Sequence, residues 1–545
     1  MTKKIVLETE VLVIGAGPVG LALAGDLGWR GRKALVIELT DGSIFQPKMD
    51  LVGIRTMEFC RRWGIVSDVE NSPYVRDYPQ DNVYLTSLNG YELGRQEMPS
   101  MKDDVPPPES PQKRERCPQN MFDPILQKFA QSQEGVSILY KHEFKSFIAN
   151  ENGIIATVEN LENNEIFEIH AKYLVGADGA HSIVRTALGI EMHGRGILTY
   201  TTNAIFRCPE FNSLHNKKPG YRYMFVGADG VFATIVAING NDLWRMSYIG
   251  SLERRALTEP ELVELAYKLM GKEFPLEMVS VLPWARAELV ADSYGSGRVL
   301  ICGDACHRTS PTGGLGMNTG IGDAVDLSWK LDALLNGWGG EKLITSYTEE
   351  RKPVAHRITQ FSTGNLEIMR GAKSSQDIFE DSEKGEQERI RVGKVLQEGL
   401  QREWLSMNMH LGNRYLDSSI IIYDDNESIE EAKLELENAI VYRPSTRPGA
   451  RAPHVWLKDG RSSLDLFGKN FVLLKLNQSV DTNGFEELCR NKGMLLDVVF
   501  NDEPQLAELY EYNLVLVRPD GHVAWRSNSL PSDIETIINT VTGNS

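Results

Sequence analysis

The sequence is poor in cysteine, and its cysteines form no recognisable pattern. Six cysteines are scattered over 545 residues, without a CxxC motif and without a second ligand pair at the spacing of a zinc site. This usage argues against a disulfide-stapled scaffold. It predicts a reduced, cytoplasmic protein without a bound metal.

Long apolar runs and an excess of positive charge are also missing. No run approaches the roughly 18 residues of a membrane-spanning helix, and no long apolar stretch follows the N-terminal lysines as it would in a signal peptide. The net charge of -17 argues against nucleic acid or an anionic membrane as a partner. What remains is an ordinary globular composition, and the length predicts two or three domains.

A glycine-rich turn stands near the N-terminus. Residues 9–38 contain a β-branched strand, a GxGxxG sequence, an Ala/Leu-rich helix and a second strand. In a dinucleotide site the first glycine permits the tight turn, the second lets the backbone approach the pyrophosphate, and the third lets helix and strand pack closely. A carboxylate ending the second strand favours FAD or NAD over NADP. The predicted cofactor-binding residues here are Gly15, Gly17, Pro18, Val19, Gly20 and Glu38.

A second glycine-rich loop, GDACHRTSPTGGLGMNTG, occupies residues 303–320 between a strand and a long helix. Asp304 stands at the carboxyl end of the strand, where α/β sheets place their ligands. His307 could suggest a metal or a catalytic dyad, but no convincing ligand set accompanies it. Gly313, Gly314 and Gly316 have no side chains and so leave backbone N–H groups accessible just before the helix. Such N–H groups can bind a group with negative charge.

The middle of the chain predicts a second sheet. Residues 195–290 contain aromatic, strand-like runs separated by turns, which indicates an inserted antiparallel sheet that could form one wall of a ligand pocket. Residues 76–116 mix turn residues and charges and predict a surface excursion. Residues 171–190 form a strand, a turn and a helix, in which Asp178 is either a simple capping acid or part of a site.

The C-terminal part changes character twice. Residues 341–440 are charged and helical, and residues 374–400 within them predict an exposed helix pair. A proline/glycine connector at 442–457 then leads to a compact α/β module of about 90 residues, which is long enough for a separate domain.

Three motifs in this order resemble a known family. GxGxxG with Glu38, then Asp178-Gly179, then GDACHRTSP are similar to the ordered motifs of the group A flavin monooxygenases, the single-component aromatic hydroxylases of the p-hydroxybenzoate hydroxylase fold. RTMEF, TSLNGYELGR and GMNTG further resemble the branch of phenol hydroxylase and 2,4-dichlorophenol 6-monooxygenase.

The resemblance implies an α/β architecture with four parts. A Rossmann-like FAD-binding domain of the GR2 type would comprise residues 1–75, 110–190 and 285–350. An inserted antiparallel-sheet substrate domain would comprise 76–109 and 191–284. A helical connector at 351–440 would lead to a thioredoxin-like domain at 441–545, in which the absence of CxxC argues against thiol-redox chemistry.

The resemblance also implies FAD as cofactor and NAD(P)H as co-substrate. Arg55 would face the pyrophosphate, Gln119 the ribityl region, and Asp304 the ribityl hydroxyls. Many relatives have Pro-Arg-Ala where this chain has Pro47-Lys48-Met49, so nucleotide handling could differ. The further cofactor-binding residues implied are Lys48, Asp178, Gly303, Pro311, Gly314, Gly316, Met317 and Asn318.

The implied reaction is hydroxylation of a phenolic or other aromatic substrate with O2, through a flavin C4a-hydroperoxide. Asp50 matches an aspartate beside the substrate hydroxyl in phenol hydroxylase, and is the candidate catalytic base. Tyr223, Phe225 and Trp284 are candidate substrate contacts, although such residues are more often core. A Baeyer–Villiger or epoxidising enzyme on the same scaffold is the alternative, and a homodimer is implied by the resemblance alone.

Overall fold

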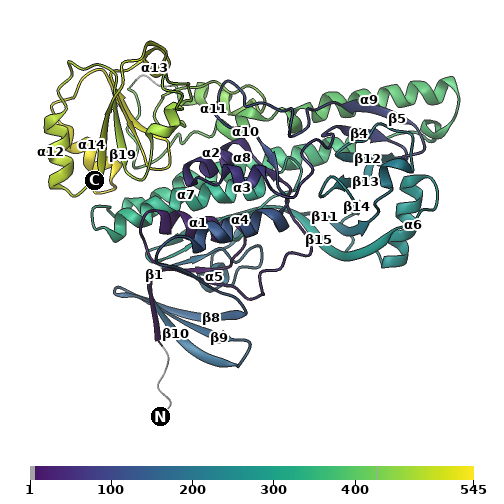
Figure 1. Ribbon diagram of the computed structural model, residues 1–545, viewed down its shortest axis with the longest axis horizontal. Coiled ribbons are helices and arrows are strands. Elements are labelled where there is room, and N and C mark those ends of the chain that lie inside the picture. Colours follow the sequence, from purple (N-terminus) through teal and green to yellow (C-terminus); the bar gives the residue numbers. More distant parts are fainter. Residues whose placement is uncertain (1–5, 426–427) are drawn as a thin grey trace.

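The computed structural model describes residues 6–425 and 428–545 and shows three sheet-centred units (Figure 1). The first sheet has the order β16-β17-β10-β1-β2-β7, with β8 and β9 extending from β10. Its parallel centre forms because the β-branched run at the end of β1 is completely buried. The strands are β1 (Val6–Ile14), β2 (Ala34–Ile37), β7 (Val136–Leu139), β8 (His142–Asn150), β9 (Gly153–Asn160), β10 (Glu165–Gly176), β16 (Gly295–Ser296) and β17 (Val299–Ile301).

Three helices pack together beside this sheet. Helix α1 contacts both α4 and α7, and small residues along α1 allow the close approach. The helices of this unit are α1 (Pro18–Trp29), α2 (Ile54–Trp63), α3 (Val66–Glu70), α4 (Gln119–Gln131), α5 (Ile183–Ala187) and α7 (Gly316–Leu335). The short strands β3 (Leu51–Val52) and β6 (Glu115–Arg116) pair beside it and join the segments before α2 and α4.

The second sheet has eight strands in the order β18-β15-β11-β14-β13-β12-β4-β5 and is largely antiparallel. One of its faces buries an aromatic core under α6 (Glu259–Met270), and part of the other packs on the long helices α8 (Lys342–Gly371) and α9 (Glu383–Trp404). The strands are β4 (Asn82–Leu85), β5 (Glu92–Gln96), β11 (Met192–Arg207), β12 (Arg222–Gly227), β13 (Gly230–Ala237), β14 (Leu243–Ile249), β15 (Glu277–Ala291) and β18 (His307–Arg308).

The expected surface excursion at residues 76–116 is wrong. Strand β4 is entirely buried and pairs in parallel with β12, and Ser110, Lys113 and Glu115 are buried as well. The turn residues and charges of this segment suggested exposure. Its charged side chains can be buried because they pair with one another, as Glu115 does with Arg76 and Lys113.

Long helices connect the second sheet to the C-terminal unit. The predicted exposed helix pair at 374–400 is instead one helix, α9, preceded by a single 3₁₀ turn at Gln376–Phe379. Ser382 stands at the start of α9 and caps it by accepting a hydrogen bond from the Gly385 amide. The helices are α8 (Lys342–Gly371), α9 (Glu383–Trp404), α10 (Met407–Leu411) and α11 (Ile429–Glu437).

The C-terminal unit contains a four-stranded mixed sheet in the order β20-β19-β21-β22. One of its cores includes Trp329 and Ala333 of α7, so this unit packs directly on the helix that follows the second glycine loop. The thioredoxin-like assignment stays a prediction. The elements are β19 (Phe471–Lys475), α12 (Asn483–Asn491), β20 (Leu496–Phe500), α13 (Pro504–Tyr510), β21 (Leu514–Val517), β22 (Val523–Ser527) and α14 (Ile534–Val541).

No helix within residues 6–425 and 428–545 is long and apolar enough to cross a membrane. The boundaries of the four predicted parts stay a prediction.

Candidate functional site

The first glycine turn leaves an open backbone at the start of α1. Gly15 has φ +104°, and a Cβ on Gly20 would lie 2.0 Å from the Gly15 carbonyl oxygen, so both positions need glycine. Gly17 precedes α1 without a side-chain cap, and a Cβ placed there would meet no atom of the described chain within 4 Å. The free N–H groups of a helix start therefore face open space, as an anionic diphosphate requires.

Glu38 closes this turn from the end of β2. Its carboxylate accepts hydrogen bonds from the Ala16 amide at 2.8 Å and from the Thr40 amide and hydroxyl at 2.9 and 2.7 Å. The side chain is only half-buried, so the carboxylate remains accessible to a ribose beside the glycine turn.

Gln119 lies at the start of α4 and links two segments near the same turn. Its Oε1 accepts from the Lys48 amide at 3.0 Å, and its Nε2 donates to Asp123 at 3.1 Å. The Lys48 residue itself is exposed. Burial raises the pKa of Asp123 to about 7, and its Oδ1 is buried without a partner among the described residues. Asp123 was missed by sequence reasoning, because nothing in the α4 pattern separates it from an ordinary helix acid.

Asp178 acts in the structure as the capping acid of α5. Its Oδ2 accepts from the Ile183 and Val184 amides at 2.7 and 3.2 Å, while Oδ1 is buried and finds no partner in the described chain. The cofactor role of Asp178 stays a prediction, and the unused oxygen leaves room for it.

The second glycine loop approaches the first. Gly303 has φ +64° and packs against the side chain of Val19, so the two motifs meet. Asp304 follows in a 3₁₀ turn (Gly303–Ala305), is exposed, and makes no hydrogen bond or ion pair within residues 6–425 and 428–545. A free carboxylate at the end of β17 fits the hydroxyl-rich chain of a flavin dinucleotide.

Helix α7 begins at Gly316 without a side-chain cap. Its first amides therefore remain available to negative charge, as predicted for the edge of a flavin ring. Pro311 is exposed and Met317 packs partly against the core of the first sheet, while Gly314 lies against Leu51. These placements fit an FAD that extends from the first glycine turn to this loop.

One side chain fixes the loop against the segment before α2. Asn318 Oδ1 accepts from the Gly53 amide at 2.8 Å and the Thr56 hydroxyl at 2.7 Å. Its Nδ2 donates to the carbonyls of Leu51 at 3.0 Å and Gly314 at 2.7 Å. The loop and the segment that carries Asp50 are thereby held together.

His307 is held by a buried acid. Its Nε2 lies 2.8 Å from Asp323 of α7, and Asp323 also accepts from Arg351 of α8 at 2.8 Å. Arg351 in turn donates to the Tyr415 hydroxyl at 3.2 Å. The histidine thus anchors the loop to the helices behind it.

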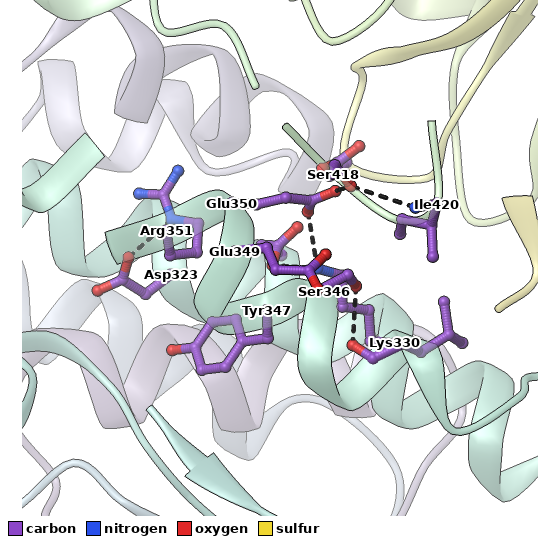
Figure 2. A network of polar contacts seen from close by, with 12 residues as sticks. Asp323, Lys330, Ser346, Tyr347, Glu349, Glu350, Arg351, Ser418 and Ile420 are labelled. Atoms are coloured by element: carbon purple, nitrogen blue, oxygen red, sulfur yellow. Dashed lines mark hydrogen bonds and ion pairs between the residues drawn. The ribbon is translucent and has the colours of Figure 1, made fainter. Parts of the chain in front are cut away.

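Buried charges lie between α7, α8 and the C-terminal unit, and Figure 2 shows Lys330 of α7 and Glu350 of α8 among them. Lys330 lies 2.8 Å from Asp326 and 2.7 Å from Glu350, and Ser418 donates to Glu350 at 2.6 Å. Arg518, from the C-terminal unit, pairs with Asp326, Glu350 and Asp520. We call this set the interdomain charge cluster: Asp326, Lys330, Glu350, Arg518 and Asp520.

The expected pyrophosphate contact of Arg55 needs correction. Its guanidinium donates to Glu58 at 2.8 Å and to the Asp520 carbonyl at 2.7 Å. Glu58 also pairs with Arg451, which is buried. The cation at the start of α2 did attract an anion, but that anion is a carboxylate of the same helix, and the C-terminal unit covers the pair.

Asp50 lies between the two sheets and is clamped by two arginines. Its Oδ1 accepts from Arg116 and its Oδ2 from Arg245, each at 3.0 Å. Arg116 also donates to the Tyr221 hydroxyl at 3.0 Å. Burial opposes ionisation of Asp50, but Arg116 and Arg245 outweigh it and hold its pKa below the usual range. Burial raises the pKa of Tyr221 well above its ordinary value, so Tyr221 keeps its proton.

The candidate substrate contacts Tyr223 and Phe225 are corrected. Both are completely buried in the aromatic core between the second sheet and α6, on the face away from Asp50. Trp284 differs: it is partly exposed on the opposite face, and its indole Nε1 has no partner among the described residues. Trp284 therefore remains a candidate.

Sequence reasoning missed most residues around Asp50. Arg116 stands just before Gln119, but Arg245 and Arg286 lie on separate strands, and only the sheet register brings them to one face. Tyr221 lies just before β12 and is identified only by its contact with Arg116. A usable signal was the strand alternation around Tyr223, because its neighbour Arg222 points to the other face.

Comparisons with known proteins agree with this geometry. Residues 8–362 match the family model described as FAD binding domain, and residues 445–545 match that described as aromatic-ring hydroxylase, C-terminal. The chain is 29% identical to the 2,4-dichlorophenol 6-monooxygenase of Delftia acidovorans, over 96% of each chain. It is 29% identical to the FAD-dependent monooxygenase apdD of Emericella nidulans, over 96% of this chain and 88% of the relative.

A solved structure supports the same placement. The rebeccamycin biosynthetic enzyme RebC with reduced flavin superposes with a TM-score of 0.91 at 34% identity, covering 99% of this chain and 100% of RebC. The family match, the relatives and the open glycine turns converge: the chain belongs to the family of FAD-dependent aromatic-ring hydroxylases and is a flavin-dependent monooxygenase with FAD as its cofactor.

Proposed function

We propose that the enzyme uses NAD(P)H and O2 to hydroxylate a phenolic ring whose hydroxyl is received by Asp50, Arg116, Arg245 and Tyr221. The observation that carries the proposal is the double ion pair of Asp50 beside the protonated Tyr221 hydroxyl. FAD, when bound, supplies the oxygen-transfer chemistry. The chain supplies the groups that bind the substrate hydroxyl and hold its charge.

The geometry changes the role first given to Asp50. A carboxylate whose pKa is held low by two arginines is a weak proton acceptor. Asp50 would therefore fix Arg116 and Arg245, whose charge favours the phenolate form of the substrate, while Tyr221 donates a hydrogen bond to its oxygen. A phenolate is the more electron-rich form, so this arrangement assists electrophilic hydroxylation.

The FAD contacts are proposed on the two glycine loops. The α1 start at Gly17 and Glu38 would hold the ADP half, and Asp304 and the first amides of α7 would hold the ribityl chain and ring edge. Asp304→Ala is expected to lower flavin occupancy, measured by absorbance near about 450 nm after purification. Full flavin content in this variant would contradict the assignment.

The substrate site is tested by a phenol screen. Phenols that stimulate NAD(P)H oxidation are sought, with H2O2 measured to score coupling. Tyr221→Phe is expected to slow hydroxylation near neutral pH and to recover as pH approaches about 10, where phenols ionise without help. Asp50→Asn should slow or uncouple hydroxylation with flavin retained. Unchanged coupled turnover across pH in both variants would contradict the proposed site.

We also propose a cytoplasmic location and, from the family resemblance, a homodimer. The six cysteines are all unpaired and buried, which suits a reducing compartment.

A further inference from the structure

Three arginines lie on one face of the second sheet. Directly paired residues of neighbouring antiparallel strands share a face. Arg222 of β12 pairs with Val236 of β13, and Val236 pairs with Arg245 of β14. The same face continues along β11 to Thr199, which pairs with Arg286 of β15. This is the face that meets Asp50, opposite the aromatic core under α6.

The carboxylates of this region do not balance its arginines. Glu403 pairs with Arg222 at 3.0 Å, and the same oxygen accepts from the Gly313 amide of the second glycine loop at 2.9 Å. Asp50 is shared by Arg116 and Arg245. Two carboxylates thus serve Arg222, Arg116 and Arg245, and the fourth arginine, Arg286, forms no ion pair with any described residue.

Arg286 is buried in spite of this. Arg286 is only 4% exposed to solvent. Its Nε donates a hydrogen bond to the Thr201 hydroxyl at 3.1 Å, whereas its Nη1 is buried without an acceptor in the described chain. Burial first, and then the nearby Arg222 against the effect of Glu403, lower the pKa of Arg286 to about 9. A buried guanidinium without a counter-charge is costly unless an anion joins it.

A second buried donor stands beside it. The Arg286 guanidinium carbon lies 5.2 Å from the centroid of the Trp284 ring, and Trp284 Nε1 also has no acceptor within residues 6–425 and 428–545. Two neighbouring unused donors, one of them charged, match the two oxygens of a carboxylate.

We propose that Arg286, together with Trp284, binds a carboxylate of the substrate, so that the enzyme acts on an acidic aromatic compound rather than a neutral phenol. This inference rests on the proposed function, because it takes the Asp50 face as the substrate face. Arg286 is a specificity residue: it selects the acid and leaves the ring hydroxyl to the groups around Asp50.

The test is a binding comparison of phenol, salicylamide and salicylate with the FAD-bound enzyme. Dissociation constants are measured by equilibrium dialysis, which needs no turnover, and by perturbation of the flavin spectrum. Salicylate is expected to bind roughly ten-fold or more tightly than its uncharged amide. Arg286→Gln should abolish that preference, and Arg286→Lys should keep part of it.

Arg195→Gln is the matched control, since Arg195 lies on β11 but is exposed and pairs with an exposed Glu367. Equal binding of salicylate and salicylamide, no saturable binding of salicylate, or an undiminished preference in Arg286→Gln would overturn the inference. Loss of flavin from Arg286→Gln with the preference intact would also overturn it, because the arginine would then serve FAD. Failure of every phenol to stimulate NAD(P)H oxidation would instead contradict the proposed function. Equilibrium dialysis would still measure the preference for salicylate over salicylamide in that case.

Discussion

The interdomain charge cluster and the arginine face of the second sheet are both buried, but they treat charge differently. In the cluster, Lys330 and Arg518 face three carboxylates, and burial raises the pKa of Asp326 so that it sheds the surplus negative charge. On the sheet face, Arg286 has no carboxylate of its own among the residues that the structure describes. A balanced cluster holds domains together, whereas an unbalanced one leaves a place for a ligand.

The largest expected effect comes from breaking the balanced cluster. Arg518→Met removes the cation shared by Asp326, Glu350 and Asp520 and leaves buried carboxylates uncompensated. The free energy of unfolding should fall by about 3–5 kcal/mol, measured by urea titration of the FAD-bound protein. The exposed pair of Lys141 and Glu162 is the control, and Lys141→Met should leave the urea midpoint unchanged. An Arg518→Met protein as stable as the parent would contradict the stabilising role of the interdomain charge cluster.

The next effect is a pH dependence at the buried ion pairs between α2 and the C-terminal unit. Against the effect of burial, Arg451 and then Arg55 lower the pKa of Glu58 from 4.5 to about 2. A depressed acid pKa stabilises the fold above pH 4.5, and this contribution is lost as pH falls toward 2.

Glu58→Gln should therefore be less stable than the parent by about 3 kcal/mol near neutral pH, with the difference shrinking between pH 4.5 and 2. Denaturant titrations at several pH values measure this difference. A gap that does not depend on pH would show that Glu58 acts by packing and not by charge.

A smaller effect of opposite sign is expected on the sheet face. Arg286→Met removes a buried charge that has no counter-ion, so the substrate-free enzyme should become more stable by about 1 kcal/mol. The melting temperature should rise in the absence of substrate. A loss of stability as large as that of Arg518→Met would mean that Arg286 has a structural partner, and the two regions would then be alike.

The parts of the site that sequence predicts best are those set by local backbone chemistry. Gly15, Gly20 and Gly303 were identifiable because a positive φ or a close backbone approach admits no other residue. These turns and the carboxylate that ends the second strand favoured FAD or NAD, and the family resemblance then implied FAD. The residues that form such features lie close together in the sequence, so these features can be predicted without knowledge of the fold.

The parts that failed depend on packing between distant elements. Alternation correctly put Tyr223 and Phe225 on one face of a strand, but only the position of α6 decides that this face is the core. Arg55 was placed correctly at the start of α2, yet its partner was decided by the C-terminal unit. Arg286 carried no signal of its own, because its importance lies in a counter-charge that the fold does not provide.

Asn318 uses both donors and both acceptors of its amide to join the flavin loop to the chain before α2. No other uncharged side chain of this size offers two of each, so a substitution or a deamidation here would loosen both segments at once. A designer who exchanges either segment between relatives must therefore move them as a pair. Through Asn318, the loop proposed to bind the flavin and the segment that carries Asp50 therefore depend on each other.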